Sequence, residues 1–394
     1  MTLQILLLEA ATFGLSYVLT RWVQRTAEPL GLIDIPNQRS SHETPTPRGG
    51  GIAIAIASLA TMGILTALGV IPEQTFLAIG PGGAAVALVG FIDDIRPLSA
   101  RIRLFVHFAA AAWAVAWIGP VTLLHTSGSD ALVFKSVDDV LSTVGIVWFL
   151  NMYNFMDGID GIAASQAVFM AAGLLLLSHF SVGIGIAAVP AAAVGAAAGG
   201  FLLVNWPPAK IFMGDVGSGY LGYLFAVLGL GCGAQSGVTT WPCLIIAGVF
   251  GVDATVTVLR RFVAGERLAE PHRTHAFQHL AQKYGHRNVT LSVALVNVAW
   301  LLPCAAASVH WPRSAADIAV VAVVPLAIGA FVIGSGRPAP SETSAIPSAD
   351  LIPFPSARRT PQDVRETLRS AAIAHPQASP AIADRKLSDA ECAN

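Results

Sequence analysis

Charged residues are scarce in this chain. Only 12% of the 394 residues are Asp, Glu, Lys or Arg, about half the share found in soluble domains. Apolar residues make up 54% of the chain, and its mean hydropathy is +0.64. This composition excludes an ordinary soluble domain and indicates a membrane protein.

Cysteine is also scarce, and the four cysteines form no C-x-x-C pair. The sequence therefore predicts neither a zinc framework nor a set of disulfides. No G-K-[ST] follows the Gly-rich turn at 214–219, so this turn is not a Walker A loop. The N-terminus has no basic stretch and no A-x-A site, which predicts a retained first helix and not a cleaved signal.

Long apolar runs fill most of the chain. They approach the roughly 20 residues that a helix needs to cross a hydrocarbon core of roughly 30 Å. So many spans must be helical, because lipid satisfies no backbone hydrogen bonds. We predict an all-α polytopic membrane protein with about 10–11 transmembrane helices. The predicted spans are 3–21, 50–70, 75–92, 104–119, 139–153, 162–180, 182–204, 219–234, 241–259, 289–308 and 315–334.

Lys and Arg gather in alternate loops between these spans. Fourteen of the 23 fall on one side, two on the other, and the rest in the C-terminal stretch. Positive residues favour the cytoplasm, so we expect the fourteen to be cytoplasmic and the N-terminus to lie outside. The same side holds five short polar segments, which we call islands, at 34–50, 93–103, 151–161, 205–219 and 260–278. Because they gather carboxylates, His and Arg at one face, we expect a site at the cytoplasmic face.

The composition changes at about residue 335. Residues 1–335 carry all the predicted spans, whereas residues 336–394 are rich in Pro, Ser and Ala with scattered charge. Such a stretch cannot bury an apolar core. We predict one integral membrane domain followed by a disordered cytoplasmic tail.

Carboxylates mark three of the islands. Asp93 and Asp94 follow a span directly, where adjacent acids oppose the helix dipole unless a divalent cation or a basic partner offsets them. Asp157 and Asp160 are three residues apart and would share a helix face. Asp215 lies in a Gly-rich turn that opens a helix, where backbone N–H groups can hold phosphate and the Asp can hold Mg²⁺. The alternatives are a solvated loop with Arg counter-ions at 93–103 and a helix cap at Asp160.

Basic residues lie in the first and last islands. Arg48 precedes a glycine run that enters the second span, and His272, Arg273 and His275 lie together near the end of the last island. The two His could form a zinc pair, but no third ligand is evident. An Arg-centred site for a diphosphate is physically better supported. The alternatives are a glycine-rich helix start and a plain polar loop.

Other polar residues lie at or near membrane depth. Asn151 and Asn154 end the span that precedes Asp157. Asp253 lies seven residues before Arg260, or about 10 Å of helix below the membrane surface. Polar groups at such depth are expensive and usually functional, and Lys210 is the expected partner of Asp253.

Carboxylates, Arg and His on one face suit a Mg²⁺-dependent reaction on a phosphate ester whose other half lies in the bilayer. A membrane phosphatase acting on a lipid diphosphate would use the same groups, with water as the acceptor. A transporter of an anionic substrate would need polar groups near the bilayer midplane along several spans. The predicted spans are nearly uncharged, which disfavours the transporter.

Five motifs carry a resemblance to a known family. They are TPTPRGGG, FIDDIRPLSARIRL, NMYNFMDGIDG, NWPPAKIFMGDVGSG and PHRTHAFQ. In order and spacing they resemble the polyprenyl-phosphate N-acetylhexosamine-1-phosphate transferases of glycosyltransferase family 4, over about residues 1–335.

The resemblance implies that a UDP-N-acetylhexosamine gives its sugar-1-phosphate to undecaprenyl phosphate and releases UMP. This reaction takes place at the bacterial inner membrane and requires Mg²⁺, with Mn²⁺ as an alternative ion. The resemblance also implies a homodimer, and we expect no nucleic-acid partner.

The resemblance further implies roles for residues in these motifs. It makes Asp215 a Mg²⁺ ligand together with Asp94, and it places Phe212 to stack on uracil. The expected catalytic residues are Asp93, Asp94, Asp157 and Asp160. The expected substrate-binding residues are Arg48, Asn151, Asn154, Phe212, His272, Arg273 and His275.

The last island narrows the branch of the family. The pentapeptide translocases carry three consecutive His there, and the common-antigen enzymes carry His-x-His-His. This chain has His-Arg-Thr-His at 272–275 and looks more like the enzymes that start O-antigen chains. The expected sugars are N-acetylfucosamine, N-acetylquinovosamine or N-acetylglucosamine.

Overall fold

A computed structural model describes residues 3–36, 44–119, 131–236, 240–267 and 272–337. These residues form a bundle of long helices with one two-stranded antiparallel sheet, in which Ile33 pairs with Pro47 and Asp34 with Thr46. The predicted tail, 336–394, lies outside the described residues apart from Gly336 and Arg337.

The first half of the chain contains α1 (Leu3–Thr26), β1 (Ile33–Asp34), β2 (Thr46–Pro47), α2 (Gly51–Ala67), α3 (Glu73–Ile95), α4 (Ala100–Ile118), α5 (Ala131–Phe155), α6 (Ile162–Leu177) and α7 (Val182–Asn205). The second half contains α8 (Gly214–Ser236), α9 (Trp241–Ile246), α10 (Gly248–Val263), α11 (Ala276–Tyr284), α12 (His286–Val296), the π-helical segment η1 (Asn297–Leu301), α13 (Leu302–His310), the 3₁₀ turn η2 (Pro312–Ser314) and α14 (Ala315–Ile333).

Each predicted span is occupied by helix. In the described part of the chain, seven helical stretches are long and apolar enough to cross a membrane, and shorter apolar helices fill the spans predicted at 50–70 and 162–180. The prediction of an all-α polytopic membrane protein is confirmed. The number of helices that cross the membrane stays a prediction.

Two predicted spans are interrupted, and one helix was not predicted. The span at 241–259 divides into α9 and α10 at Ala247, and the span at 289–308 contains the π-helical segment η1. The additional helix is α11, which is short and polar. It begins after its N-cap His275, whose backbone amide donates to the Gln278 side chain over 3.3 Å, as in one half of a capping box.

The centre of the bundle is α8, which packs against α2, α3, α4, α5 and α7. Its Tyr220 and Tyr223 are fully buried. A buried hydroxyl needs a hydrogen-bond partner. Tyr220 Oη lies 2.7 Å from Ser58 Oγ, and Tyr223 Oη donates to the Ala110 carbonyl over 3.2 Å. These bonds fix the rotation of α8, and with it the position of its first turn.

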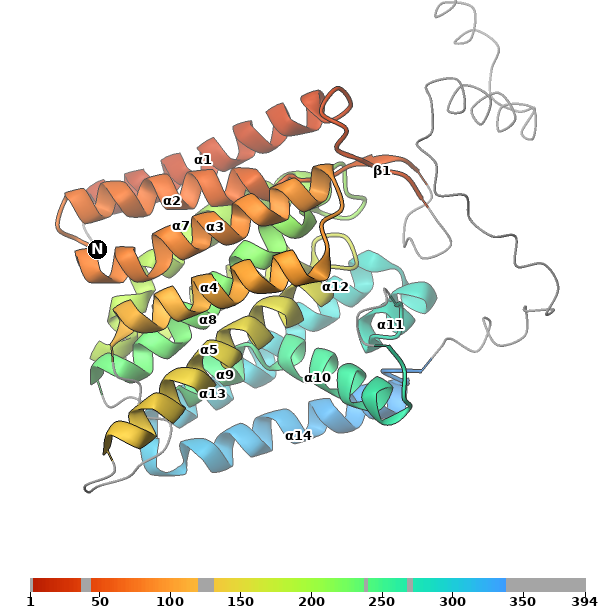
Figure 1. The fold of residues 1–394 in the computed structure, drawn as a ribbon. Coiled ribbons are helices and arrows are strands. Elements are labelled where there is room, and N and C mark those ends of the chain that lie inside the picture. Colours follow the sequence, from red (N-terminus) through yellow and green to blue (C-terminus); the bar gives the residue numbers. More distant parts are fainter. Residues whose placement is uncertain (1–2, 37–43, 120–130, 237–239, 268–271, 338–394) are drawn as a thin grey trace, which may run out of the picture. The chain divides into compact units, whose positions relative to one another are not determined.

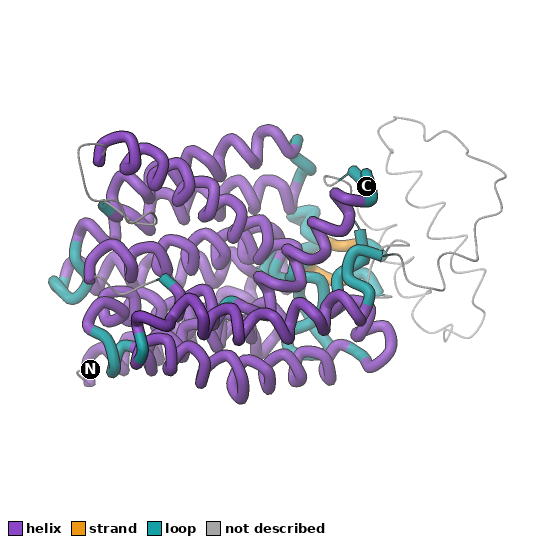
Figure 2. Tube along the Cα trace, turned by 90° about the horizontal axis from the view of Figure 1, so that it is seen from below, coloured by secondary structure: helices purple, strands orange, loops and turns teal. Residues whose placement is uncertain are grey.

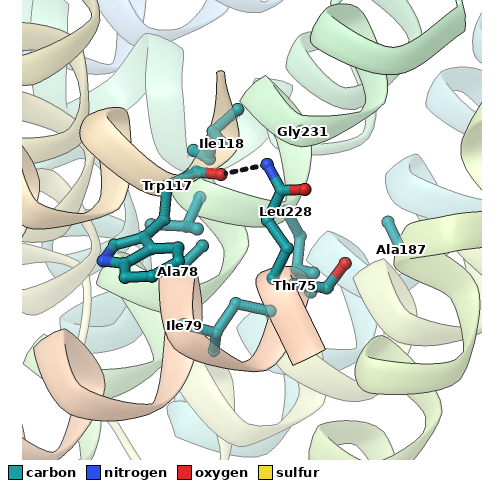
Figure 3. A pocket seen from close by; sticks show the side chains of 10 residues that line it. Thr75, Ala78, Ile79, Trp117, Ile118, Ala187, Leu228 and Gly231 are labelled. Carbon is teal, nitrogen blue, oxygen red and sulfur yellow. Dashed lines mark hydrogen bonds between the residues drawn. The ribbon is translucent and has the colours of Figure 1, made fainter. Parts of the chain in front are cut away.

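The loops that carry the islands lie at one end of the bundle. The sheet and α11 share this end (Figure 1), and Figure 2 shows the strands at the end opposite the N-terminus. Figure 3 shows a cavity at the other end of α3, where Gln74 donates to the Trp117 carbonyl over 2.8 Å. Its volume of about 30 Å³ suits one or two water molecules and excludes a sugar nucleotide.

Candidate active site

Asp94 is a buried cap on another helix. Its Oδ1 accepts the backbone amide of Asp215 over 3.1 Å, and its Oδ2 accepts that of Val216 over 3.2 Å. The residue is only 4% exposed. A carboxylate at a helix N-terminus satisfies free amides and is favoured by the helix dipole. Asp94 therefore fixes the start of α8, and with it the backbone of Asp215.

Gly214 makes this approach feasible. Its φ is +76°, and a Cβ added there would overlap the carboxylate of Asp94. A positive φ is strained for other residues, and here the space is also taken. The cap at Asp94 thus explains why a glycine stands at 214 in the Phe-Met-Gly-Asp sequence of residues 212–215, the FMGD motif.

Asp93 and Asp215 form salt bridges with the same Arg side chain. Arg103 Nη1, from the first turn of α4, lies 2.9 Å from Asp93 Oδ2 and 2.9 Å from Asp215 Oδ2. Asp93 Oδ1 also accepts the backbone amide of Leu98 over 2.6 Å. The sequence named Arg103 only as a counter-ion in the solvated-loop alternative. The counter-ion assignment is correct for Asp93, but the bridge to Asp215 ties this loop into the cluster.

Asn154 holds the other side of Asp215. Its Nδ2 donates to Asp215 Oδ1 over 3.0 Å and to Ser218 Oγ over 2.9 Å. Asn151 points elsewhere, because its Nδ2 donates to the Val147 carbonyl of its own helix over 2.7 Å. The structure thus brings Asn154 to the carboxylates and leaves Asn151 bonded along α5.

Asp157 is the least restrained of the predicted acids. It follows α5 and is half-buried, and in the described part of the chain its carboxylate accepts no hydrogen bond. Burial, and next the carboxylates of Asp215, Asp94 and Asp160, raise the pKa of Asp157 to about 8. Its environment therefore holds an excess of negative charge that a cation would relieve.

Asp160 braces three segments. Its Oδ2 accepts the amide of Ala209 over 3.0 Å, its Oδ1 lies 3.2 Å from Nδ1 of His286, and its backbone carbonyl accepts the Thr290 hydroxyl over 3.0 Å. The cap of α6 is Gly161, with no side-chain cap hydrogen bond. The alternative that made Asp160 a helix cap is therefore wrong.

The first island is built into the same end of the bundle. Arg48 Nη2 donates to the backbone carbonyl of Asp94. Phe212 donates its amide to the Pro47 carbonyl over 2.8 Å, and its carbonyl accepts the amide of Gly50 over 3.0 Å. The Phe212 side chain is half-buried. Arg39 and His42, in the same island, lie outside the described residues.

The HRTH loop, residues 272–275, lies beside the Asp157 loop, which we define as residues 156–161 between α5 and α6. The rings of His272 and His275 stack at 5.0 Å, and the Phe155 ring lies 6.5 Å from each of them. A Cβ at Gly158 would approach the Phe277 ring to 2.9 Å. Arg273 is half-buried next to these rings in sequence.

The side chains at the site can be compared with the ligands that zinc and magnesium require. Among the described residues, no three His, Cys, Asp or Glu side chains are placed to hold a metal, so the zinc pair at 272 and 275 gains no support. Mg²⁺ needs fewer protein ligands, since it takes one or two carboxylates and completes its octahedral shell with water and phosphate. Asp93 and Asp215, which converge on one Arg103 nitrogen, fit that requirement.

Comparison with known proteins identifies the family of this chain. The sequence profile of glycosyl transferase family 4 matches residues 76–233. The chain is 30% identical, over 285 residues, to the probable undecaprenyl-phosphate N-acetylglucosaminyl 1-phosphate transferase of Bacillus subtilis (strain 168), a match that covers 71% of this chain and 78% of that protein. The chain belongs to glycosyl transferase family 4.

Two further relatives show the spread of similarity. The decaprenyl-phosphate N-acetylglucosaminephosphotransferase of Mycobacterium tuberculosis (strain ATCC 25618 / H37Rv) is 28% identical over 353 residues, covering 81% of this chain and 86% of that protein. The phospho-N-acetylmuramoyl-pentapeptide-transferase of Gluconobacter oxydans (strain 621H) is 31% identical over 273 residues, covering 61% and 72%.

Sequence reasoning missed several groups at the candidate site. The bridge made by Arg103, the contact of His286 with Asp160 and the bond from Asn154 to Ser218 were not predicted. For Arg103 a signal existed, since it lies ten residues after Asp93 at the start of a span. His286 is 126 residues from Asp160, and nothing in the sequence pairs them. The catalytic and binding roles expected from sequence stay predictions.

Proposed function

We propose that this protein transfers N-acetylhexosamine-1-phosphate from a UDP-sugar to undecaprenyl phosphate and releases UMP. Family 4 membership and the relatives' names support the reaction class. The observation that carries it is the cluster of Asp93, Asp215 and Arg103 at the end of an apolar bundle. Such a place lets a water-soluble diphosphate meet a phosphate whose chain lies in lipid.

The proposed setting is the bacterial inner membrane, with the site on the cytoplasmic face. The excess of Lys and Arg in the loops on that side supports this orientation. N-acetylglucosamine is the favoured sugar, because it appears in the names of the Bacillus subtilis and Mycobacterium tuberculosis relatives. We propose the initiating step of O-antigen or a related cell-envelope polysaccharide as the role. A homodimer stays a prediction.

Mg²⁺, or Mn²⁺ in its place, is the proposed cofactor. Asp215 is the best-placed ligand, since Asn154 and Arg103 hold its two oxygens at the open side of α8. Asp94 is buried and both its oxygens accept backbone amides. Asp93 Oδ2 instead faces the same Arg103 nitrogen as Asp215 Oδ2, so Asp93 is better placed as a second ligand. When bound, the ion would neutralise a diphosphate and polarise it for displacement.

The protein's own groups have separable tasks. The guanidinium of Arg103, 36% exposed at its side chain, can meet a phosphate oxygen while it holds two carboxylates. Asp157 has unengaged oxygens and a pKa raised to about 8, so it can hold a proton at the site near neutral pH. The carboxylate of Asp94 accepts two backbone amides of α8, and that of Asp160 accepts the Ala209 amide and contacts His286. These two acids therefore orient the backbone around the site. The first and last islands supply Arg48, His272, Arg273 and His275 for the diphosphate and sugar.

The test is an assay of the purified chain in detergent with undecaprenyl phosphate, Mg²⁺ and a panel of UDP-N-acetylhexosamines. We expect UMP release that needs both the lipid phosphate and the ion, with UDP-N-acetylglucosamine as the best donor. Release of inorganic phosphate from added undecaprenyl diphosphate, with water as the acceptor and no UMP release from the UDP-sugars, would favour the phosphatase. Substrate movement across vesicles without UMP release would favour the transporter.

A matched pair of variants checks the site. Asp215→Asn should lower turnover at least about 100-fold, as removal of a charge-stabilising group does. Asp139→Asn should leave turnover unchanged, because Asp139 pairs with Lys135 near the start of α5, far from Phe155 at its end. Equal activity of the two variants would contradict the placement of the site.

A further inference from the structure

A second buried carboxylate holds a helix start near the site. Asp253, on α10, is 5% exposed. Its Oδ1 accepts the backbone amide of Ala276 over 2.9 Å, and its Oδ2 accepts that of Phe277 over 3.1 Å. Asp253 therefore caps α11, as Asp94 caps α8. The sequence predicted Lys210 as the partner of this acid, but the partners are backbone amides from another segment.

Two hydroxyls complete the shell of Asp253. Thr257 Oγ1 donates to Oδ1 over 3.2 Å from one turn along α10, and Ser335 Oγ donates to Oδ1 over 3.0 Å. His275 Nδ1 lies 3.7 Å from the same oxygen. The carboxylate is thus surrounded by donors, which is what a buried charge requires.

The residues after the last helix close the loop from the other side. The amide of Gly336 donates to the Thr274 carbonyl over 2.6 Å, and Ser335 is fully buried. Gly336 has a φ of +77°, and a Cβ there would lie 3.0 Å from the Thr257 carbonyl oxygen. The turn that ends α14 is therefore part of the HRTH loop's support.

The first turn of α11 contacts both the HRTH loop and the Asp157 loop. His275 stacks on Phe277 at 5.6 Å and on His272 at 5.0 Å. The Phe277 ring packs against Gly158, the residue after Asp157. A shift of the first turn of α11 would consequently move the HRTH loop and the Asp157 loop together.

We propose that Asp253 and the Ser335–Gly336 turn form a positioning lock, which sets the HRTH loop against the Asp157 loop. Their oxygens and amides are used up inside the protein, so they act through His275 and Phe277 without touching substrate. The effect on turnover rests on the proposed function, whereas the effect on loop order does not.

The test compares Ser335→Ala with Ser308→Ala. Both serines are buried, but Ser308 donates to the Ala305 carbonyl within its own helix over 2.8 Å. We expect Ser335→Ala to speed backbone amide exchange in residues 272–284 about tenfold and to lower kcat for UDP-N-acetylglucosamine about tenfold, with KM within about twofold. Ser308→Ala should change neither.

Asp253→Asn is the stronger variant. It replaces one acceptor by a donor, so the amide of Phe277 loses its partner. We expect kcat to fall about 10- to 100-fold, the usual effect of losing an outer-shell partner, with the same acceleration of amide exchange.

Exchange is measured without substrate, so the two hypotheses fail separately. Exchange in Ser335→Ala equal to that in Ser308→Ala overturns the lock. Faster exchange with unchanged kcat overturns its role in positioning. A wild-type protein without transferase activity overturns the proposed function, and the exchange comparison alone then decides whether the lock exists.

Discussion

Asp94 and Asp215 are 121 residues apart, yet the carboxylate of Asp94 accepts the backbone amide of Asp215 over 3.1 Å. This bond joins the end of α3 to the start of α8. The DD and FMGD motifs are therefore halves of one structural unit. One acid fixes a backbone, and the other presents its side chain to the open end of the bundle.

The two acids should consequently fail in different ways. We expect Asp94→Asn to lower the free energy of unfolding by about 1–2 kcal/mol, the usual cost of losing a helix cap, and to lower turnover as well. Asp215→Asn should lower turnover at unchanged stability. Thermal unfolding in detergent, measured beside UMP release, separates the two effects. Equal stability of the two variants would contradict the cap.

Gly214 should not tolerate a side chain. Gly214→Ala places a Cβ on the carboxylate of Asp94 at a φ of +76°, so we expect loss of activity and a lower melting temperature. Gly231→Ala is the control in the same helix, because a Cβ there meets nothing within 4 Å. It should be neutral or stabilise by up to about 1 kcal/mol. Equivalent melting temperatures would contradict this account of the motif.

Arg103 should matter for turnover because it holds Asp93 and Asp215 together. We expect Arg103→Ala to lower kcat about 100-fold, within the range found for a lost electrostatic stabiliser. Arg103→Lys should retain more activity, since a point charge can still lie between two carboxylates. Arg101→Ala is the control, because Arg101 is exposed on the same turn of helix. Steady-state UMP release measures all three.

His286 should affect binding of the UDP-sugar more than the chemical step. It contacts Asp160, which holds the backbone of Ala209, three residues before Phe212, the side chain expected to stack on uracil. We expect His286→Ala to raise KM for the UDP-sugar about three- to tenfold with a smaller change in kcat. His310→Ala, an exposed histidine at the end of α13, is the control. A fall in kcat at constant KM would contradict this assignment.

Part of the site could be predicted from the sequence because it is local. Asp93, Asp157 and Asp215 each follow or open an apolar run, and the alternation of runs and loops places them at one end of a bundle. The contacts could not be predicted, since His286 and Asp160, or Ser335 and Asp253, are joined by packing across many residues. Asn151 and Asn154 were treated alike, but their places on α5 turn only Asn154 toward Asp215.

The sequence by itself determined the apolar helices, the polar islands between them and the family motifs. Those depend on composition and spacing along the chain, because lipid forces each apolar run into a helix. Only the tertiary structure decided which acid is a cap and which faces the open site. That choice depends on where helix N-termini lie relative to each carboxylate. The packing of α3 on α8 and of α10 on α11 sets those positions, and local sequence does not encode it.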